Sequence, residues 1–305
     1  CVAYNKKKYI VTNYHVVENA IVIKVFDYAV DIIALDMFTD LALLTCPDYA
    51  EPLEFGTVET GDLIDIQGYP LHERGLNFVS GSISKLTKIY NLRDKRLMFM
   101  SDCLTDHGNS GSPALCDNKV IGVLNSGMGK SVNYSVIIPF FAVQDFIKKA
   151  VLLEKEKLIK TRHVYQRYCK FSWQVINDVM REVFKLKNNN GILCEGEICT
   201  HIQGIPILAD GQIRYEDFLK LLGYKGVKSS ELISFHYLFN FLEGEIEMES
   251  AKNVISADIK YYVPDTVINY KIFGDMVFVR GNLLLAERVE QYVPQDFPYL
   301  VYAKN

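Results

Sequence analysis

Short β-rich runs, separated by turn residues at close intervals, fill the chain from Tyr9 to Pro139. Val, Ile, Leu, Thr and Tyr dominate these runs, and Gly, Asn, Asp and Pro lie between them. Many short strands with frequent turns are typical of an all-β barrel or sandwich. The sequence therefore predicts a mostly β fold here, with strands at residues 9–12, 21–26, 41–45, 63–68 and 120–125.

Beyond Pro139 the hydrophobic pattern changes to that of a helix. Apolar residues recur on one helical face through residues 140–153, and Lys148 and Lys149 fall on the opposite face. The charged run 154–162 has no turn residues and indicates a solvated helix end or a linker. We therefore place the main domain boundary there, after a first domain of residues 1–152.

The sequence of the second half of the chain predicts a smaller domain that mixes helices and strands. An amphipathic helix is expected around a set of apolar residues that ends before the run 188–191, namely Val175, Ile176, Val179, Met180, Val183 and Phe184. Short strands and helices follow to Glu249, so residues 163–250 are expected to form an α+β domain. Residues 251–305 are again strand-like and rich in Tyr and Val, and we assign this β-rich segment to no domain type.

The composition limits the partners of the chain. Of its 305 residues 49% are apolar and 23% are charged, so it can build substantial cores. The net charge is only −4 and no dense Lys/Arg stripe occurs, so nucleic acid is not an expected partner. No apolar run approaches the ~20 residues that cross a bilayer, and no membrane span is expected.

The seven cysteines are scattered and odd in number, unlike the disulfide framework of a small secreted protein. Reduced thiols and the lack of a recognisable signal peptide favour a cytoplasmic location but do not settle the compartment, and a chain that opens on Cys1 leaves a removed leader open. Cys194, Cys199 and His201 lie close together, but with no second pair at zinc-finger spacing they are a weak metal signal. We expect neither a metal nor another cofactor.

A glycine-rich turn at residues 106–113 has the features that amide hydrolysis needs. A Ser hydroxyl becomes a strong nucleophile when a His accepts its proton and a carboxylate fixes the tautomer of that His. The developing oxyanion also needs backbone N–H donors. Gly108 and Gly111 flank Ser110 and permit backbone angles that residues with a Cβ resist. Ser110 is therefore the candidate nucleophile.

Two polar residues upstream are the candidate partners of Ser110. His15 follows the run 9–12, where the end of a strand could present it to a cleft, and we predict it as the general base. Asp40 introduces the apolar run 41–45, where a carboxylate could support a His. Taken singly, each of the three candidates has a purely structural explanation. His15 could be an interior histidine, Asp40 a turn residue, and Ser110 part of an ordinary Gly-Ser loop.

Taken together, the three segments resemble the HtrA/Deg family of trypsin-like serine proteases. The blocks Thr-Asn-Tyr-His-Val-Val, Asp-Leu-Ala-Leu-Leu and Gly-Asn-Ser-Gly-Ser-Pro follow the order and approximate spacing of that family. The order His, Asp, Ser is that of the chymotrypsin type. The resemblance covers the first half of the chain continuously. It implies a chymotrypsin-type double β-barrel and a serine endopeptidase that acts on unfolded or extended polypeptides.

The resemblance also implies the remainder of the site. The backbone N–H groups of Gly108 and Ser110 would form the oxyanion hole. Leu104 would lie at the base of the S1 pocket, with residues from Asn125 to Gly127 as one wall. An apolar floor implies cleavage after small or medium hydrophobic residues, with loose selectivity.

The sequence departs from the family pattern at two places in this first half. Ser112 stands where the family usually has a second Gly, which raises the alternative that the oxyanion turn is altered. The chain opens 14 residues before His15, without the segment that bacterial members use to form trimers. A homo-oligomer therefore stays an open alternative to a monomer.

The region after residue 163 resembles an abridged PDZ domain. Residues 171–174 and 190–193 resemble its entry, and residues 209–213 resemble a later strand. The stretch between its first strand and its Gly-Asp block is almost wholly deleted, so the fold could persist without a peptide-binding groove.

The alternatives to an endopeptidase are a catalytically silent protease-fold scaffold that binds protein partners, and a chain that processes only itself.

Overall fold

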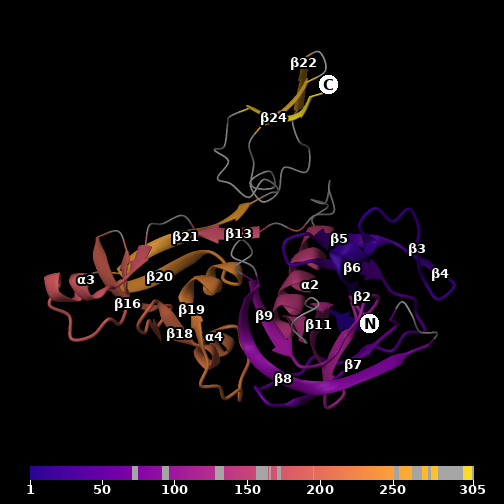
Figure 1. The fold of residues 1–305 in the computed structure, drawn as a ribbon, viewed down its shortest axis with the longest axis horizontal. Coiled ribbons are helices and arrows are strands. Elements are labelled where there is room, and N and C mark those ends of the chain that lie inside the picture. Colours follow the sequence, from indigo (N-terminus) through magenta and orange to yellow (C-terminus); the bar gives the residue numbers. More distant parts are fainter. Residues whose placement is uncertain are drawn as a thin grey trace. The chain divides into compact units, whose positions relative to one another are not determined.

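The computed structural model describes residues 1–70, 75–90, 96–127, 134–155, 164, 166–169, 173–194, 196–250, 254–262, 270–273, 276–280 and 298–303 (Figure 1). The chain divides into two compact units, Cys1–Tyr261 and Tyr262–Asn305. The predicted boundary at residues 153–162 lies largely outside the described residues. The division into domains 1–152, 163–250 and 251–305 therefore stays a prediction.

The first sheet of the larger unit is an open, four-stranded antiparallel sheet in the order β1-β2-β6-β5. Its strands are β1 (Val2–Tyr4), β2 (Lys7–Thr12), β5 (Ile32–Asp36) and β6 (Leu41–Thr45). A separate hairpin joins β3 (Ile23–Val25) to β4 (Tyr28–Val30). The sheet does not close into a barrel, because this hairpin pairs only with itself.

The second sheet closes into a six-stranded barrel in the order β10-β11-β12-β9-β8-β7. Its strands are β7 (Leu63–Gly68), β8 (Asn77–Tyr90), β9 (Arg96–Ser101), β10 (Pro113–Cys116), β11 (Lys119–Gly127) and β12 (Ser135–Pro139). Figure 1 shows β8 as the long curved strand along one side of this barrel. The prediction of a mostly β fold is confirmed, with one of the two expected barrels closed and the other open.

Helix α2 (Phe140–Lys155) follows the barrel directly, as the helical period from residue 140 predicted. It packs against β11 and β12 of the barrel and also against β5 and β6 of the first sheet. Because one helix contacts both sheets, it fixes the sheet that carries His15 and Asp40 relative to the barrel that carries Ser110.

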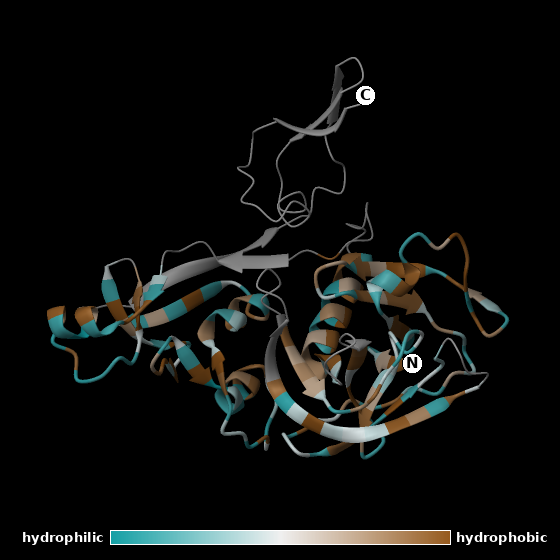
Figure 2. Cartoon of the chain, viewed as in Figure 1, coloured by the Kyte–Doolittle hydropathy of each residue, from teal (hydrophilic) through white to brown (hydrophobic). Residues whose placement is uncertain are grey.

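The remainder of the larger unit is built on another antiparallel sheet, in the order β13-β21-β20-β16-β15-β14 with β17 beside β16. Its strands are β13 (Gln166–Cys169), β14 (Trp173–Val175), β15 (Ile192–Cys194), β16 (Glu197–Ile202), β17 (Ile205–Pro206), β20 (Glu245–Ser250) and β21 (Val254–Tyr262). Figure 2 shows hydrophilic and hydrophobic residues alternating along β20, as expected for a strand with one buried face.

A short segment in this region packs beside the sheet. It contains β18 (Gln212–Arg214), α4 (Tyr215–Leu221), β19 (Leu232–Ser234) and the 3₁₀ helix η1 (Phe235–Asn240). The large rings of α4 and η1 are buried. The assignment of this α+β region as an abridged PDZ domain stays a prediction.

The helix predicted around 175–184 is shorter and less buried than expected. Helix α3 spans Asp178–Val183, whereas Val175 is the last residue of β14. The helix begins after Asn177, because the side chain of Asn177 accepts a hydrogen bond from the Met180 N–H at 2.9 Å. The predicted apolar face was wrong in one respect, since Val179 and Val183 are 69% and 70% exposed.

The second unit contains a three-stranded antiparallel sheet in the order β22-β23-β24. Its strands are β22 (Tyr270–Phe273), β23 (Met276–Arg280) and β24 (Pro298–Ala303). The strand-like pattern of the last segment predicted such elements. In the part of the chain that the structure describes, no helix is both long and apolar enough to cross a membrane.

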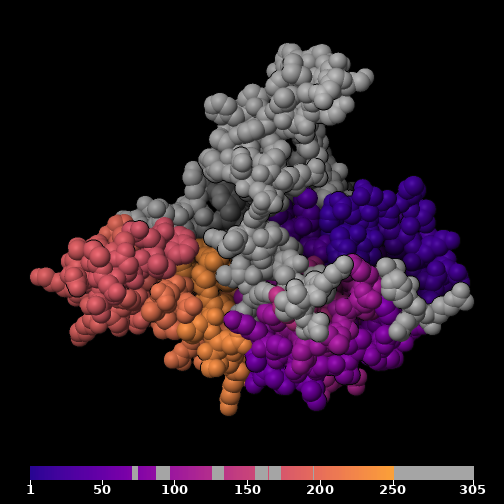
Figure 3. Space-filling view, in the orientation of Figure 1, coloured from indigo at the N-terminus to yellow at the C-terminus, as the bar shows by residue number. Residues whose placement is uncertain are grey.

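An aromatic cluster joins α2 to the α4 and η1 segment inside the larger unit. Phe141 is 2% exposed, and its ring contacts those of Phe99, Phe140, Tyr215, Phe218 and Phe241 at centroid distances of 5.3 to 6.3 Å. Figure 3 shows the orange atoms of this segment against the purple atoms of the barrel. One continuous hydrophobic core therefore extends from the barrel into the region after residue 163.

Polar contacts surround the aromatic cluster. The carboxylate of Glu231 accepts hydrogen bonds from the Leu86 N–H at 3.2 Å and from the Thr60 hydroxyl. The carboxylate of Glu59 accepts one from the Lys228 N–H at 3.2 Å. These contacts come from both sides of the predicted domain boundary, so the two regions share polar as well as apolar contacts.

Phe141→Ala is expected to lower the free energy of unfolding by about 3–5 kcal/mol, because it removes a buried ring and leaves a cavity among five others. Leu152→Ala, a 45% exposed position on the same helix, should change it by no more than about 0.5 kcal/mol. Urea titration followed by fluorescence measures both. A Phe141→Ala loss as small as that of Leu152→Ala would contradict the shared core.

Candidate active site

Asp40 lies immediately before β6, whose first four residues are fully buried. Its φ of +57° is in the left-handed region, which residues with a Cβ rarely adopt. Two hydrogen bonds to its backbone carbonyl hold this conformation, from the Asn13 side-chain amide at 3.0 Å and from the Tyr14 N–H at 3.1 Å. Asn13 is fully buried, so it fixes Asp40 from inside the fold.

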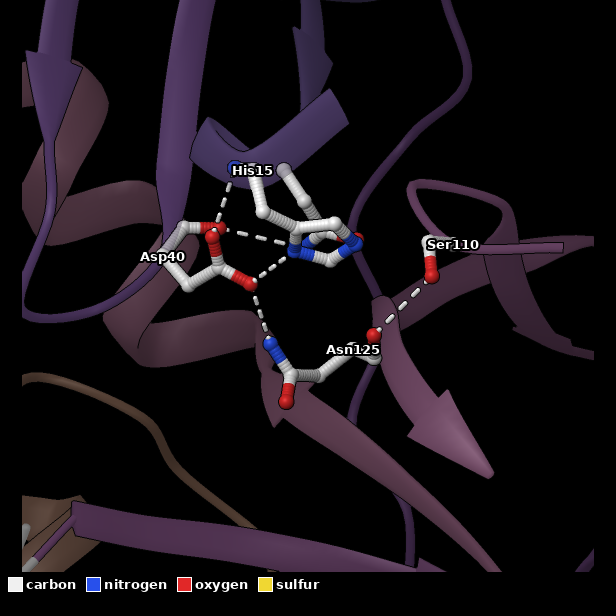
Figure 4. Close-up of polar contacts among 5 residues, drawn as sticks. His15, Asp40, Ser110 and Asn125 are labelled. Carbon is white, nitrogen blue, oxygen red and sulfur yellow. Dashed lines mark hydrogen bonds and ion pairs between the residues drawn. The ribbon is translucent and has the colours of Figure 1, made fainter. Parts of the chain in front are cut away.

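His15 lies on α1 (Tyr14–Val17), a single helical turn that follows β2, and not on a strand end as the sequence predicted. The turn directs its imidazole toward Asp40 (Figure 4). His15 Nδ1 lies 2.6 Å from Asp40 Oδ2, and the His15 backbone N–H donates to Asp40 Oδ1 at 2.9 Å. Because a carboxylate only accepts, Nδ1 carries the proton and Nε2 is left as the basic nitrogen.

Asn125 makes a contact that the sequence did not predict. Its side-chain amide donates to Asp40 Oδ2 at 2.6 Å, the same oxygen that contacts His15 Nδ1. The register of β11 against β12 shifts between Leu124 and Ser126, and such a bulge re-aims the side chain at that point. Strand periodicity contains no signal for a bulge, so the sequence placed Asn125 only in the S1 wall.

Ser110 lies in the turn that precedes β10, immediately before two residues whose backbones bond to β11. The Gly111 N–H donates to the Leu124 carbonyl at 2.9 Å, and the Leu124 N–H donates to the Ser112 carbonyl at 2.8 Å. The Ser110 hydroxyl donates to the Asn125 carbonyl at 3.2 Å. In Figure 4 the Ser110 hydroxyl points to that carbonyl, and the described residues contain no Ser110–His15 hydrogen bond.

Close contact between Gly111 and Thr12 brings the two sheets together at the site. Gly111 has φ +85°, and a Cβ on it would overlap Thr12 Oγ1. Thr12 is the last residue of β2 and lies three residues before His15. A glycine at position 111 therefore lets the turn of Ser110 approach the strand that leads to His15.

The predicted oxyanion donors lie on the same turn. Gly108 has φ +95°, a value that favours glycine, and the Asn109 N–H closes the turn onto the Asp106 carbonyl at 3.2 Å. Among the described residues, no acceptor bonds the N–H of Gly108 or Ser110. Two backbone donors beside a Ser hydroxyl are what a developing oxyanion requires.

The predicted S1 pocket is only partly covered by the described residues. Leu104 is 64% exposed, and Gly127 ends β11 opposite Ser135. Residues 128–133, which follow the predicted wall, lie outside the described residues. The assignment of Leu104, Asn125 and Gly127 to S1 therefore stays a prediction.

Cys103 is a free thiol close to this turn in sequence. It is fully buried, and desolvation raises the pKa of its thiol above the ordinary value. A buried thiol with a raised pKa is inert. Among the described residues, no group of three or more His, Cys, Asp or Glu side chains is arranged to hold a metal ion.

Comparison with known proteins finds trypsin-like and DegP-like proteases. Residues 1–123 match the family model of the trypsin-like peptidase domain. The putative mitochondrial protease Do-like 3 of Arabidopsis thaliana is 24% identical over 89% of this chain and 53% of its own length. The probable periplasmic serine endoprotease DegP-like of Chlamydia muridarum is 30% identical over 72% of this chain and 44% of its own. This chain is similar to proteases of the HtrA/Deg family.

A solved structure shows the fold of this chain independently. The HtrA-type protease AlgW, in complex with a decapeptide, superposes with a TM-score of 0.56 at 16% identity, over 85% of this chain and 81% of AlgW. That identity is low enough that the likeness concerns the fold alone. The chain spans about half the length of the curated relatives that it matches.

Proposed function

We propose that this chain is a serine endopeptidase that cuts unfolded or extended polypeptide segments. The observation that carries the proposal is the 2.6 Å contact between His15 Nδ1 and Asp40 Oδ2, which leaves Nε2 as a base. Ser110 lies across the same site on a turn with two unused N–H donors. A base, an orienting carboxylate, a hydroxyl and an oxyanion site are together the parts of a Ser-His-Asp hydrolase.

In the proposed reaction Ser110 Oγ forms a bond to the peptide carbonyl carbon while its proton passes to His15 Nε2. The carbonyl electron pair moves onto oxygen, and the N–H groups of Gly108 and Ser110 stabilise the resulting anion. His15 then gives its proton to the leaving amine, the C–N bond breaks, and an acyl-enzyme remains. Water hydrolyses the ester by the same proton route.

The hydroxyl must leave the Asn125 carbonyl before this step. A rotation about χ1 of Ser110 is the change that would release the hydroxyl from this acceptor. Catalytic hydrogen bonds in unliganded enzymes are often long or misaligned and tighten when substrate binds. The 3.2 Å bond to Asn125 is therefore consistent with a resting form of the site.

Covalent labelling of the wild-type chain tests the proposal. A fluorophosphonate probe should add one phosphonyl group per chain, and peptide mapping should locate it on Ser110. Ser112, which lies in the same peptide but is 8% exposed, is an internal control and should stay unmodified. A folded chain that is not labelled, or is labelled on Ser112, would contradict the proposal and favour the scaffold alternative.

A further inference from the structure

Ser112 occupies a buried position that the mechanism above does not use. Its side chain is 8% exposed, and that of Asn109, at the other end of the turn, is 3% exposed. The Ser112 N–H donates to the Asn109 carbonyl at 3.0 Å, so the two residues close the turn that carries Ser110. Buried polar side chains beside a nucleophile need a structural partner or a functional reason.

Gly68, the last residue of β7, lies beside both side chains. Strands β10 and β7 are antiparallel and pair Ala114 with Ile66. If this register is continued by two residues, Ser112 lies opposite Gly68. A Cβ on Gly68 would overlap Ser112 Oγ and Asn109 Oδ1. Gly68 does not have the positive φ that favours glycine, so the glycine is required by space and not by backbone conformation.

We infer that Ser112 is a positioning residue for Ser110, and that it acts by packing its hydroxyl into the space above Gly68. The inference rests on the proposed peptidase function. Ser110 lies between Asn109 and Ser112 in the chain, and the Ser112 N–H donates to the Asn109 carbonyl, so a shift of Ser112 moves Ser110 as well. The Ser112 carbonyl also accepts from the Leu124 N–H at 2.8 Å, which attaches the turn to β11. The departure from the family's second Gly is thus accommodated by Gly68 and does not collapse the turn.

The rate of fluorophosphonate labelling measures the effect, since it reports the geometry of Ser110 and the oxyanion donors. Gly68→Ala should lower the second-order rate constant by about 10²-fold, the size expected for an error of ~1 Å in a reacting group. Turnover of a peptide substrate should show the loss in kcat more than in KM, because the substrate-binding residues are untouched. Gln67→Ala, whose side chain points to the opposite face of β7, should leave both unchanged.

A double-mutant cycle separates positioning from a general loss of stability. In the Ser112→Gly background only the overlap with Asn109 Oδ1 remains, so adding Gly68→Ala should cost less than it does in the wild-type background. Thermal midpoints are measured for all four proteins. The inference would be overturned if Gly68→Ala lowered the labelling rate constant by the same factor in both backgrounds. It would also be overturned if the loss of labelling rate simply followed the fall in thermal midpoint across the four proteins. A Gly68→Ala chain labelled at the wild-type rate would overturn it as well.

The failure of the proposed function gives a different result. If the folded wild-type chain is not labelled, the peptidase assignment fails and the positioning role fails with it. If the wild type is labelled and the cycle shows no coupling, only the positioning role fails.

Discussion

Ser110→Ala is expected to lower kcat for a casein-type substrate by about 10⁶-fold, the loss that removal of the nucleophile causes in Ser-His-Asp hydrolases. The methyl group cannot attack a carbonyl, and the neighbouring nucleophiles are buried. Ser112 is buried against Gly68, and the Cys103 thiol is desolvated. A fluorescently quenched casein, followed to its detection limit, measures the change.

Ser80→Ala is the matched control, because it removes the hydroxyl of an exposed Ser on β8, outside the site. Its turnover should equal that of the wild type. Both variants should keep the wild-type circular dichroism spectrum, since the Ser110 hydroxyl makes one hydrogen bond of 3.2 Å to a carbonyl. Equal turnover by wild type and Ser110→Ala would refute the peptidase assignment, and unchanged capture of a protein partner by both would support a scaffold.

The candidate site could be predicted from the sequence because its three side chains lie beside local signals. Asp40 directly precedes a continuous apolar strand, and Ser110 lies in a glycine turn. His15 follows a β-rich run. Each signal is local in the chain, and their order made the family resemblance specific. That order did not reveal the helical turn at His15, because four residues are too few to show helical periodicity.

The interactions that hold the site together could not be predicted, because they depend on tertiary contacts. The amide of Asn125 reaches Asp40 only because a bulge turns it out of the regular strand pattern. The space above Gly68 and the contact between Gly111 and Thr12 follow from how strands pair across the fold. None of these has a periodic or compositional signature.

Other differences between prediction and structure concern how far elements extend. The apolar residues at 175–184 fit a helix, yet with its cap at Asn177 the helix begins only at Asp178, three residues after the end of β14. The helical spacing of the apolar residues predicted a buried face, and it did not predict that Val179 would be exposed. Local capping chemistry decided the boundary, as it often does at helix ends.

Asp40→Asn is expected to lower kcat by about 10⁴-fold while KM stays nearly unchanged. Both carboxylate oxygens accept: Oδ1 from the His15 backbone N–H, and Oδ2 from His15 Nδ1 and the Asn125 amide. An Asn has only one oxygen, so its NH₂ group must face one of these donors in either orientation. With the NH₂ at the Oδ2 position, His15 must move its proton to Nε2 to relieve the conflict, and Nε2 then cannot accept the proton of Ser110.

Asp48→Asn makes the same change of charge at an exposed carboxylate and should leave kcat unaltered. Steady-state kinetics on one peptide substrate gives kcat and KM for the three proteins. A chemical-shift measurement of the His15 ring nitrogens distinguishes the cause, because the proton should move from Nδ1 to Nε2 only in Asp40→Asn. A loss of kcat with Nδ1 still protonated would mean that Asp40 acts on the fold of the site and not on the tautomer of His15.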